Sequence, residues 1–193
     1  MGSHVTGYAN MAKSMVDYFS EKNGSKTKTV NLIPGFIEPS DMTEIKRLAT
    51  LMGVKTIMFP DTSKVLNGPL TGKFKMFPEG GVTIEQLRKT GSSNGSLGLG
   101  EICAGAAARA LDAKCKVPCQ VINLPIGLQD TDIYIDTLRR LAGVNVSEEI
   151  NLERGQLVDA ICDWQQYLHG KRVALVGDPD HLLALARFLT ALD

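Results

Sequence analysis

Short apolar runs alternate along this chain with longer stretches in which apolar residues recur every third or fourth position. A short, nearly continuous apolar run is typical of a strand buried on both faces, and the longer spacing is typical of a helix with one buried face. Their alternation predicts an α/β domain with a parallel sheet and helices on both of its faces. The five predicted strands are Thr29–Ile33, Lys55–Phe59, Ser96–Leu99, Cys119–Leu124 and Arg172–Val176.

Capping residues predict where the intervening helices begin and end. Two segments have the capping-box pattern, in which the first and fourth residues satisfy free backbone N–H groups at a helix start. Gly143 predicts a helix end, because glycine readily adopts the left-handed conformation found there. The predicted starts are Asp41–Glu44, Thr83–Gln86, Asp130, Ser147 and Asp178–Pro179.

Residues 60–82 interrupt the alternation with many prolines and glycines. Within them, Lys73–Phe77 alternates between polar and apolar residues as an exposed strand does. We therefore expect an excursion from the sheet that contains a hairpin. We expect residues 1–170 to form one domain that includes this excursion, and residues 171–193 to supply the strand and helix that begin a further domain.

Two carboxylates lie opposite an apolar stripe on the helix predicted after Ser147. Asp159 and Asp163 are one helical turn apart, and like charges at that spacing disfavour each other slightly. One interpretation is a solvated acidic face. The other is half of a site for a hard cation at a subunit contact, because two carboxylates supply only part of the oxygen shell that Ca²⁺ requires. The predicted buried stripe is Leu157, Ile161, Trp164 and Leu168.

Composition excludes several classes of function. The 193 residues contain 21 Lys and Arg and 21 Asp and Glu, without a basic run, so the charge pattern of a nucleic-acid-binding protein is missing. No apolar stretch is long enough to cross a bilayer, and no signal peptide is recognisable. We expect a cytoplasmic protein whose four cysteines are mostly buried thiols.

Recognisable catalytic and cofactor motifs are also missing. No strand is followed by the glycine-rich turn that phosphate binding needs. Gly98–Cys103 has only two suitably spaced glycines, which favours a plain strand-to-helix turn over a ligand seat at a helix N-terminus. Cys115 and Cys119 lack the further thiols of a metal or iron–sulfur site, and we expect them to flank a helix-to-strand turn. We identify no catalytic residue.

Several short segments of the sequence, considered in order, nevertheless resemble one known family. Together they cover essentially the whole chain and resemble the beta chains of nitrogenase molybdenum-iron proteins, within the nitrogenase component 1 superfamily. The resemblance implies a Rossmann-like domain that binds no nucleotide, and a chain that is a central fragment of a longer subunit. The segments are Gly2–Tyr8, Asn31–Phe36, Leu124–Leu128 with Thr131–Asp132, Glu153–Asp159, and Leu168–Arg172 with Gly177–Asp180.

The resemblance also implies cofactors and partners. In the family, the ligands of the iron–sulfur P-cluster lie upstream of the matched region, so neither Ser3 nor any of the four cysteines inherits that role. Asp159 and Asp163 match two aspartates of a calcium or iron site at the contact between two beta chains. The implied partners are the nitrogenase alpha chain, a second beta chain and the nitrogenase iron protein, and no nucleic acid or membrane. The fragment alone is expected to be inactive.

Two other functions remain open at this point. A cofactor-assembly scaffold of the same superfamily would share the fold and hold a cofactor precursor without turnover. A small-ligand-binding sensor domain would use the crevice beyond the carboxyl ends of the strands.

Overall fold

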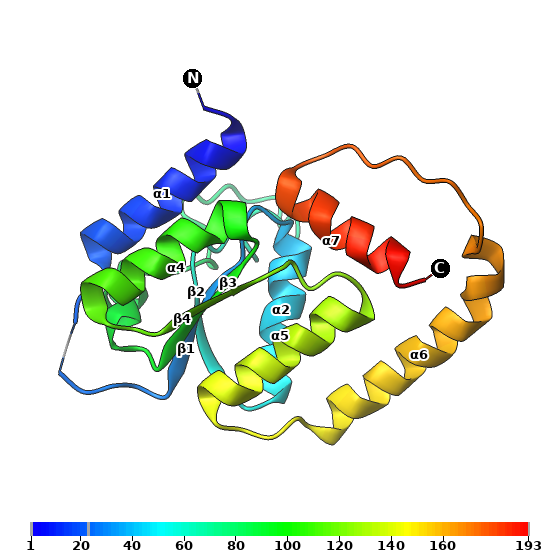
Figure 1. Ribbon diagram of the computed structural model, residues 1–193. Coiled ribbons are helices and arrows are strands. Elements are labelled where there is room, and N and C mark those ends of the chain that lie inside the picture. The colour runs from blue at the N-terminus through cyan, green and yellow to red at the C-terminus, as the bar shows by residue number, and fades with distance from the viewer. Residues whose placement is uncertain (1, 23, 193) are drawn as a thin grey trace.

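The structure is a computed structural model that describes residues 2–22 and 24–192. Its centre is one parallel sheet in the order β2-β1-β3-β4, so the predicted α/β class is confirmed (Figure 1). The register pairs Val30 of β1 with Thr56 of β2 and with Gly95 of β3. The strands are β1 (Thr29–Ile33), β2 (Lys55–Met58), β3 (Gly95–Leu99) and β4 (Cys119–Ile122).

Helices cover both faces of this sheet. One face packs against α2 and α5, and the other packs against α1, α3 and α4. None of the helices within the described residues is long and apolar enough to cross a membrane. The helices are α1 (His4–Phe19), α2 (Pro39–Leu51), α3 (Ile84–Lys89), α4 (Glu101–Cys115), α5 (Gly127–Ala142), α6 (Glu148–Leu168) and α7 (Pro179–Thr190), and a 3-10 turn, η1, spans Thr90–Ser92.

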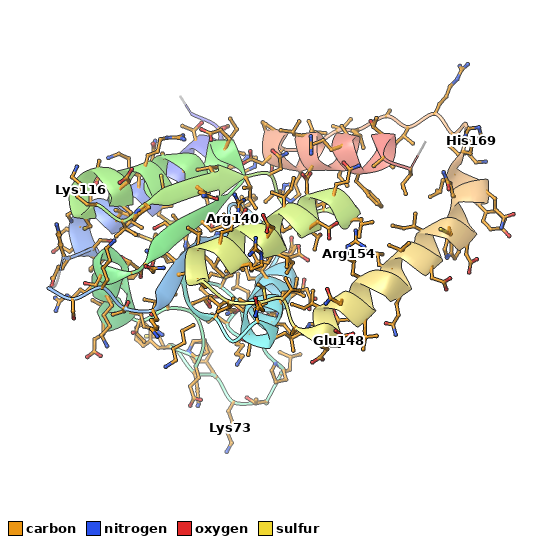
Figure 2. The ribbon with its side chains drawn as sticks, turned by 60° about the horizontal axis from the view of Figure 1, so that its bottom comes forward. Lys73, Lys116, Arg140, Glu148, Arg154 and His169 are labelled. Carbon is orange, nitrogen blue, oxygen red and sulfur yellow. The ribbon has the colours of Figure 1, made fainter. Side chains whose placement is uncertain are left out.

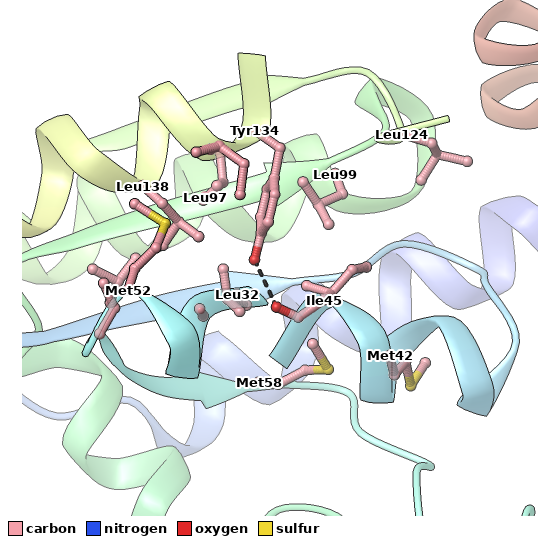
Figure 3. Close-up of a cluster of buried hydrophobic side chains, with 14 of the residues drawn as sticks. Leu32, Met42, Ile45, Met52, Met58, Leu97, Leu99, Leu124, Tyr134 and Leu138 are labelled. Carbon is pink, nitrogen blue, oxygen red and sulfur yellow. Dashed lines mark hydrogen bonds between the residues drawn. The ribbon is translucent and has the colours of Figure 1, made fainter. Parts of the chain in front are cut away.

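Tyr134 anchors the core between the sheet and helices α2 and α5. Its ring is fully buried beside Leu32, Leu97 and Leu99 (Figure 3). Its hydroxyl donates to the backbone carbonyl of Ile45 at 2.9 Å, so the phenol joins α5 to α2 without leaving a buried donor unpaired.

On the opposite face of β1, the buried side chain of Asn31 links neighbouring elements by hydrogen bonds, as Tyr134 does on the first face. Its side-chain nitrogen donates to the carbonyl of Thr90 at 2.9 Å and to the hydroxyl of Ser96 at 3.1 Å. Its side-chain oxygen accepts from the hydroxyl of Ser93 at 2.8 Å. The side chain is fully buried and therefore ties β1 to β3 and to the turn that precedes β3.

Local capping signals predicted several helix ends correctly. Thr83 and Gln86 form the reciprocal capping box of α3, and Ser147 caps α6. Gly143 ends α5 with a φ of 67°. Cys115 and Cys119 flank the turn from α4 to β4, as expected.

Two predicted helix starts are wrong. Helix α2 begins at Pro39, ahead of the proposed box at Asp41–Glu44, because proline fits the first helical position with its φ already fixed. Helix α5 begins at Gly127, so Asp130 lies within its first turn. There, Asp130 is buried and paired with Arg187 at 3.0 Å.

Two predicted strands are also wrong. Arg172–Val176 is not a strand, because no strand among the described residues lies beside it to satisfy its backbone, and Val176 is 98% exposed. Lys73–Phe77 forms no hairpin, and no residue from 60 to 82 belongs to a strand. Its Phe74 and Phe77 rings are exposed, so an alternating pattern without a covering layer gave no strand.

The buried hydrogen bonds of Asn31 predict a large effect on stability. Asn31→Leu removes three hydrogen bonds and leaves the Thr90 carbonyl without that donor in the core, and we expect a loss of about 3 kcal/mol in the free energy of unfolding. Urea unfolding monitored by circular dichroism measures it. Tyr134→Phe is the matched control, since it removes one buried hydrogen bond and should lose only about 1 kcal/mol. Equal losses in both variants would contradict the role given to Asn31.

Candidate functional site

Helix α6, which holds the acidic pair, is fixed to the fold along its first half. Ser147 caps its first turn. Arg47 of α2 pairs with Glu153 at 2.7 Å, and this hydrogen bonding lowers the pKa of Glu153. Arg154 pairs with Asp132 of α5 at 2.9 Å (Figure 2). Beyond Arg154 the helix extends away from the sheet (Figure 1).

Asp159 and Asp163 lie on this extended half, and both are exposed. Neither carboxylate has an ion pair within the described residues, and in the same residues no group of three or more His, Cys, Asp or Glu side chains could hold a metal. Positions one turn apart on a helix place their Cβ atoms about 6 Å from each other. The pair offers the hard oxygen ligands that Ca²⁺ prefers, but only part of a shell of about six to eight oxygens.

The apolar stripe opposite this pair differs from its prediction. Trp164 is 63% exposed, and Leu157 and Leu168 are each 42% exposed, so the stripe is not buried. Ile150 is the one buried residue that α6 contributes. The helical spacing was predicted correctly, but of the stripe only Ile161 is half-buried, where it faces α5 and α7.

Shallow hollows lie along the uncovered stripe instead. Leu157 lines a pocket of about 470 Å³ between α2, α5 and α6. Leu168 lines another of about 350 Å³, formed with Val173 and Leu175 of the extended segment and with Leu189 of α7. The walls of these hollows are largely apolar, although charged side chains such as Glu44, Asp136 and Arg154 also line the first one.

A second candidate place is the crevice beyond the carboxyl ends of β1 and β3. The chain leaves these neighbouring strands toward opposite sides of the sheet, and ligands of doubly wound domains bind at such a switch point. Gly35 and Gly100 follow the two strands with φ values of 72° and 86°. Here Asp180 of α7 enters the crevice, and its carboxylate accepts hydrogen bonds from the backbone N–H groups of Ile102 and Cys103 at 3.1 and 3.0 Å.

Sequence reasoning missed Asp180. Residues 98–103 do form the expected strand-to-helix turn. Asp178 is the N-cap by backbone conformation, but its carboxylate lies 3.1 Å from His4 and makes no capping bond. Asp180 is separated from its partners Ile102 and Cys103 by 78 and 77 residues, so no local pattern marked it.

The Cys103 thiol and the Tyr8 phenol near this crevice both have raised pKa values and stay protonated at neutral pH. Burial, more than the neighbouring carboxylates, raises the pKa of Cys103 to about 11, so its thiol is protonated at neutral pH. Burial likewise raises the pKa of Tyr8, whose ring packs on Phe36 at 5.5 Å. All four cysteines are free; Cys103 and Cys115 are buried as expected, whereas Cys162 is exposed on α6.

Comparisons with known proteins identify the family. The sequence profile described as "Nitrogenase component 1 type Oxidoreductase" matches residues 1–193. The chain is 51% identical over 192 residues to the nitrogenase molybdenum-iron protein beta chain of Clostridium pasteurianum, covering 100% of this chain and 42% of that protein. It is 35% identical over 194 residues to the same subunit of Methanothermobacter thermautotrophicus, covering 98% of this chain and 42% of that protein.

A solved structure agrees with the sequence matches. The structure titled "Nitrogenase Cp1 at pH 6.5" superposes with a TM-score of 0.97 at 51% identity, over 100% of this chain and 42% of the other. The chain thus spans about two fifths of the length of these relatives. A profile match over every residue, with this fold, shows that the chain belongs to the nitrogenase component 1 type oxidoreductase family.

Proposed function

We propose that this chain is the central part of a nitrogenase molybdenum-iron protein beta chain and serves as scaffold and subunit contact for ATP-driven dinitrogen reduction. The observation that carries the proposal is 51% identity to such a beta chain over the whole of this chain. Because the match covers 42% of that relative, the activity, substrate and partners of the complete protein are inferred from the family. The inferred partners are the nitrogenase alpha chain, a second beta chain and the iron protein.

The P-cluster of the complete protein is proposed to be held by residues outside this chain. The described part of the chain offers no cluster of metal-ligating side chains, and its thiols are dispersed. Cys103 and Cys115 lie at opposite ends of α4, and Cys162 lies on α6. We therefore propose a structural role for this region toward the cluster. Free thiols throughout also suit the reducing cytoplasm, where we place the protein.

Asp159 and Asp163 are proposed as half of a calcium or iron site at a contact between two beta chains. The proposal is supported by their exposure on the extended half of α6 and by the lack of a third ligand nearby among the described residues. A bound cation removes the repulsion between the two carboxylates, and oxygens from the neighbouring subunit complete its shell.

The division of the chain at residue 170 also remains a proposal. Residues 171–176 are extended, largely exposed and unpaired in the described structure. We propose that they form the first strand of a further domain once its other strands are present. Helix α7 would then bridge the two domains, since its Ala184 is already buried with α5 and the sheet.

The two alternative functions are not favoured. The closely similar relatives are nitrogenase beta chains, which weighs against a separate assembly scaffold. The crevice where a sensor domain would bind its ligand contains the carboxylate of Asp180.

A metal titration tests the acidic pair. The assembled protein, in which two complete beta chains meet, should bind Ca²⁺ or Fe²⁺ in calorimetric titration. Asp159→Asn with Asp163→Asn should weaken binding by about 100-fold or more, because two charged ligands are lost. Glu148→Gln with Glu149→Gln is the control, since it removes two exposed charges from the same helix and should bind normally. Equal affinity in all three proteins would remove the assignment.

A segment exchange tests the function itself. The matching region of the Clostridium pasteurianum beta chain is replaced by this sequence, and the hybrid is assembled with its alpha chain and iron protein. We expect acetylene reduction within about tenfold of the parent, because the exchanged scaffold keeps every contact of the shared fold. The chain alone, mixed with iron protein and ATP, should form no ethylene. A hybrid that assembles but is inactive, or a chain active alone, would refute the proposal.

A further inference from the structure

Helix α7 lies across the carboxyl-terminal edge of the sheet, near the start of α4 (Figure 1). Its only buried residues are Asp180 and Ala184, and Leu183 is exposed. Leu182, Leu185, Phe188 and Leu189 are half-buried, so apolar packing holds one side of this helix, and its polar contacts are considered in turn.

Asp180 supplies the first of these polar contacts. It is 8% exposed, and its two carboxylate oxygens each accept one backbone N–H from the first turn of α4. The first N–H groups of a helix have no partner within the helix, and together they carry a partial positive charge. The N-cap of α4 is Gly100, which has no side chain to satisfy them. The carboxylate of Asp180, from α7, accepts hydrogen bonds from two of these N–H groups instead.

The loop before α4 is shaped to admit the carboxylate. Gly100 has a φ of 86°, and a Cβ added there would lie 2.6 Å from Oδ2 of Asp180. Any side chain would thus displace the carboxylate. Doubly wound domains that bind nucleotides use the same combination of a close glycine and a helix N-terminus to hold a phosphate. In this chain the anion at the helix N-terminus is the carboxylate of Asp180.

Two further contacts fix the C-terminal end of α7. Near its C-terminal end, Arg187 pairs with the buried carboxylate of Asp130 at 3.0 Å. Phe188 packs directly over Gly127, where an added Cβ would lie 2.3 Å from the ring. These contacts orient the helix along α5, whereas Asp180 alone joins it to α4 through buried hydrogen bonds.

We propose that Asp180 is a latch: its carboxylate is the resident anion of the strand-end crevice, and it both seats α7 on the core and closes the crevice. While the carboxylate is present, seating of α7 and occupation of this position by an external anion exclude each other. The latch needs no cofactor and is independent of the function proposed above.

Chemical rescue tests the latch in the full chain. Asp180→Ala removes the carboxylate and leaves space for formate. We expect hydrogen exchange across residues 179–190 to rise by about tenfold or more, since the seating contact is lost. Formate at about 0.1 M should reverse the rise, because the space left by the carboxylate is enclosed only while α7 lies on α4, so formate filling it favours the seated form. Sodium chloride of equal ionic strength should not.

A neighbouring carboxylate provides the control. Asp178→Ala removes the contact with His4 from the same end of α7, and formate should have no effect on it. Unchanged exchange in Asp180→Ala would overturn the proposal. So would equal rescue by chloride, or rescue of Asp178→Ala by formate.

A measurement on the unaltered chain remains decisive if Asp180→Ala does not fold. The N–H groups of Ile102 and Cys103 should exchange about tenfold or more slowly than those of Glu148 and Glu149 in the exposed first turn of α6, because the carboxylate protects them. Equal exchange in the two first turns would overturn the latch.

Discussion

The parallel sheet is the constraint from which the rest of this structure follows. Parallel neighbours are joined by crossovers, so β1 and β3 are covered by helices on both faces, with α2 and α5 on one and α1 and α4 on the other. The same geometry places the carboxyl ends of all strands, and the N-terminus of α4, at one edge. That edge concentrates unpaired backbone donors and must receive an acceptor. Asp180 meets this requirement from within the chain.

Burial on both faces also explains why the sheet could be predicted. The central strands β1 and β3 are almost wholly buried and the edge strands β2 and β4 only partly, and all four strands were located within two residues at their ends. Arg172–Val176 has the same composition but no neighbouring strand among the described residues. An apolar run favours a strand, but the strand forms only where a neighbouring strand completes its backbone hydrogen bonds. The run itself does not record whether that neighbouring strand belongs to the same stretch of sequence.

The range of each interaction separates correct predictions from missed ones. Thr83 with Gln86 and Ser147 with Ile150 are hydrogen-bonded across three residues, so their pattern is visible in the sequence. Arg187 and Asp130 are 57 residues apart, and Asp180 is farther still from Ile102. Such pairs depend on the crossover topology, which local spacing does not encode. The latch and the true environment of Asp130 therefore emerged only from the structure.

Helix α6 shows what periodicity determines and what it leaves open. The spacing fixed the angle between the acidic pair and the apolar stripe, but not whether either face is covered. Leaving Trp164 and both leucines of the stripe in water forgoes several kcal/mol of burial, about 25 cal/mol for each Å². Helix α6 therefore exposes two distinct surfaces, one apolar and one that carries Asp159 and Asp163. Under the function proposed above, the apolar surface packs with further polypeptide and the acidic surface binds a cation, which makes α6 the part of this domain that depends most on its surroundings.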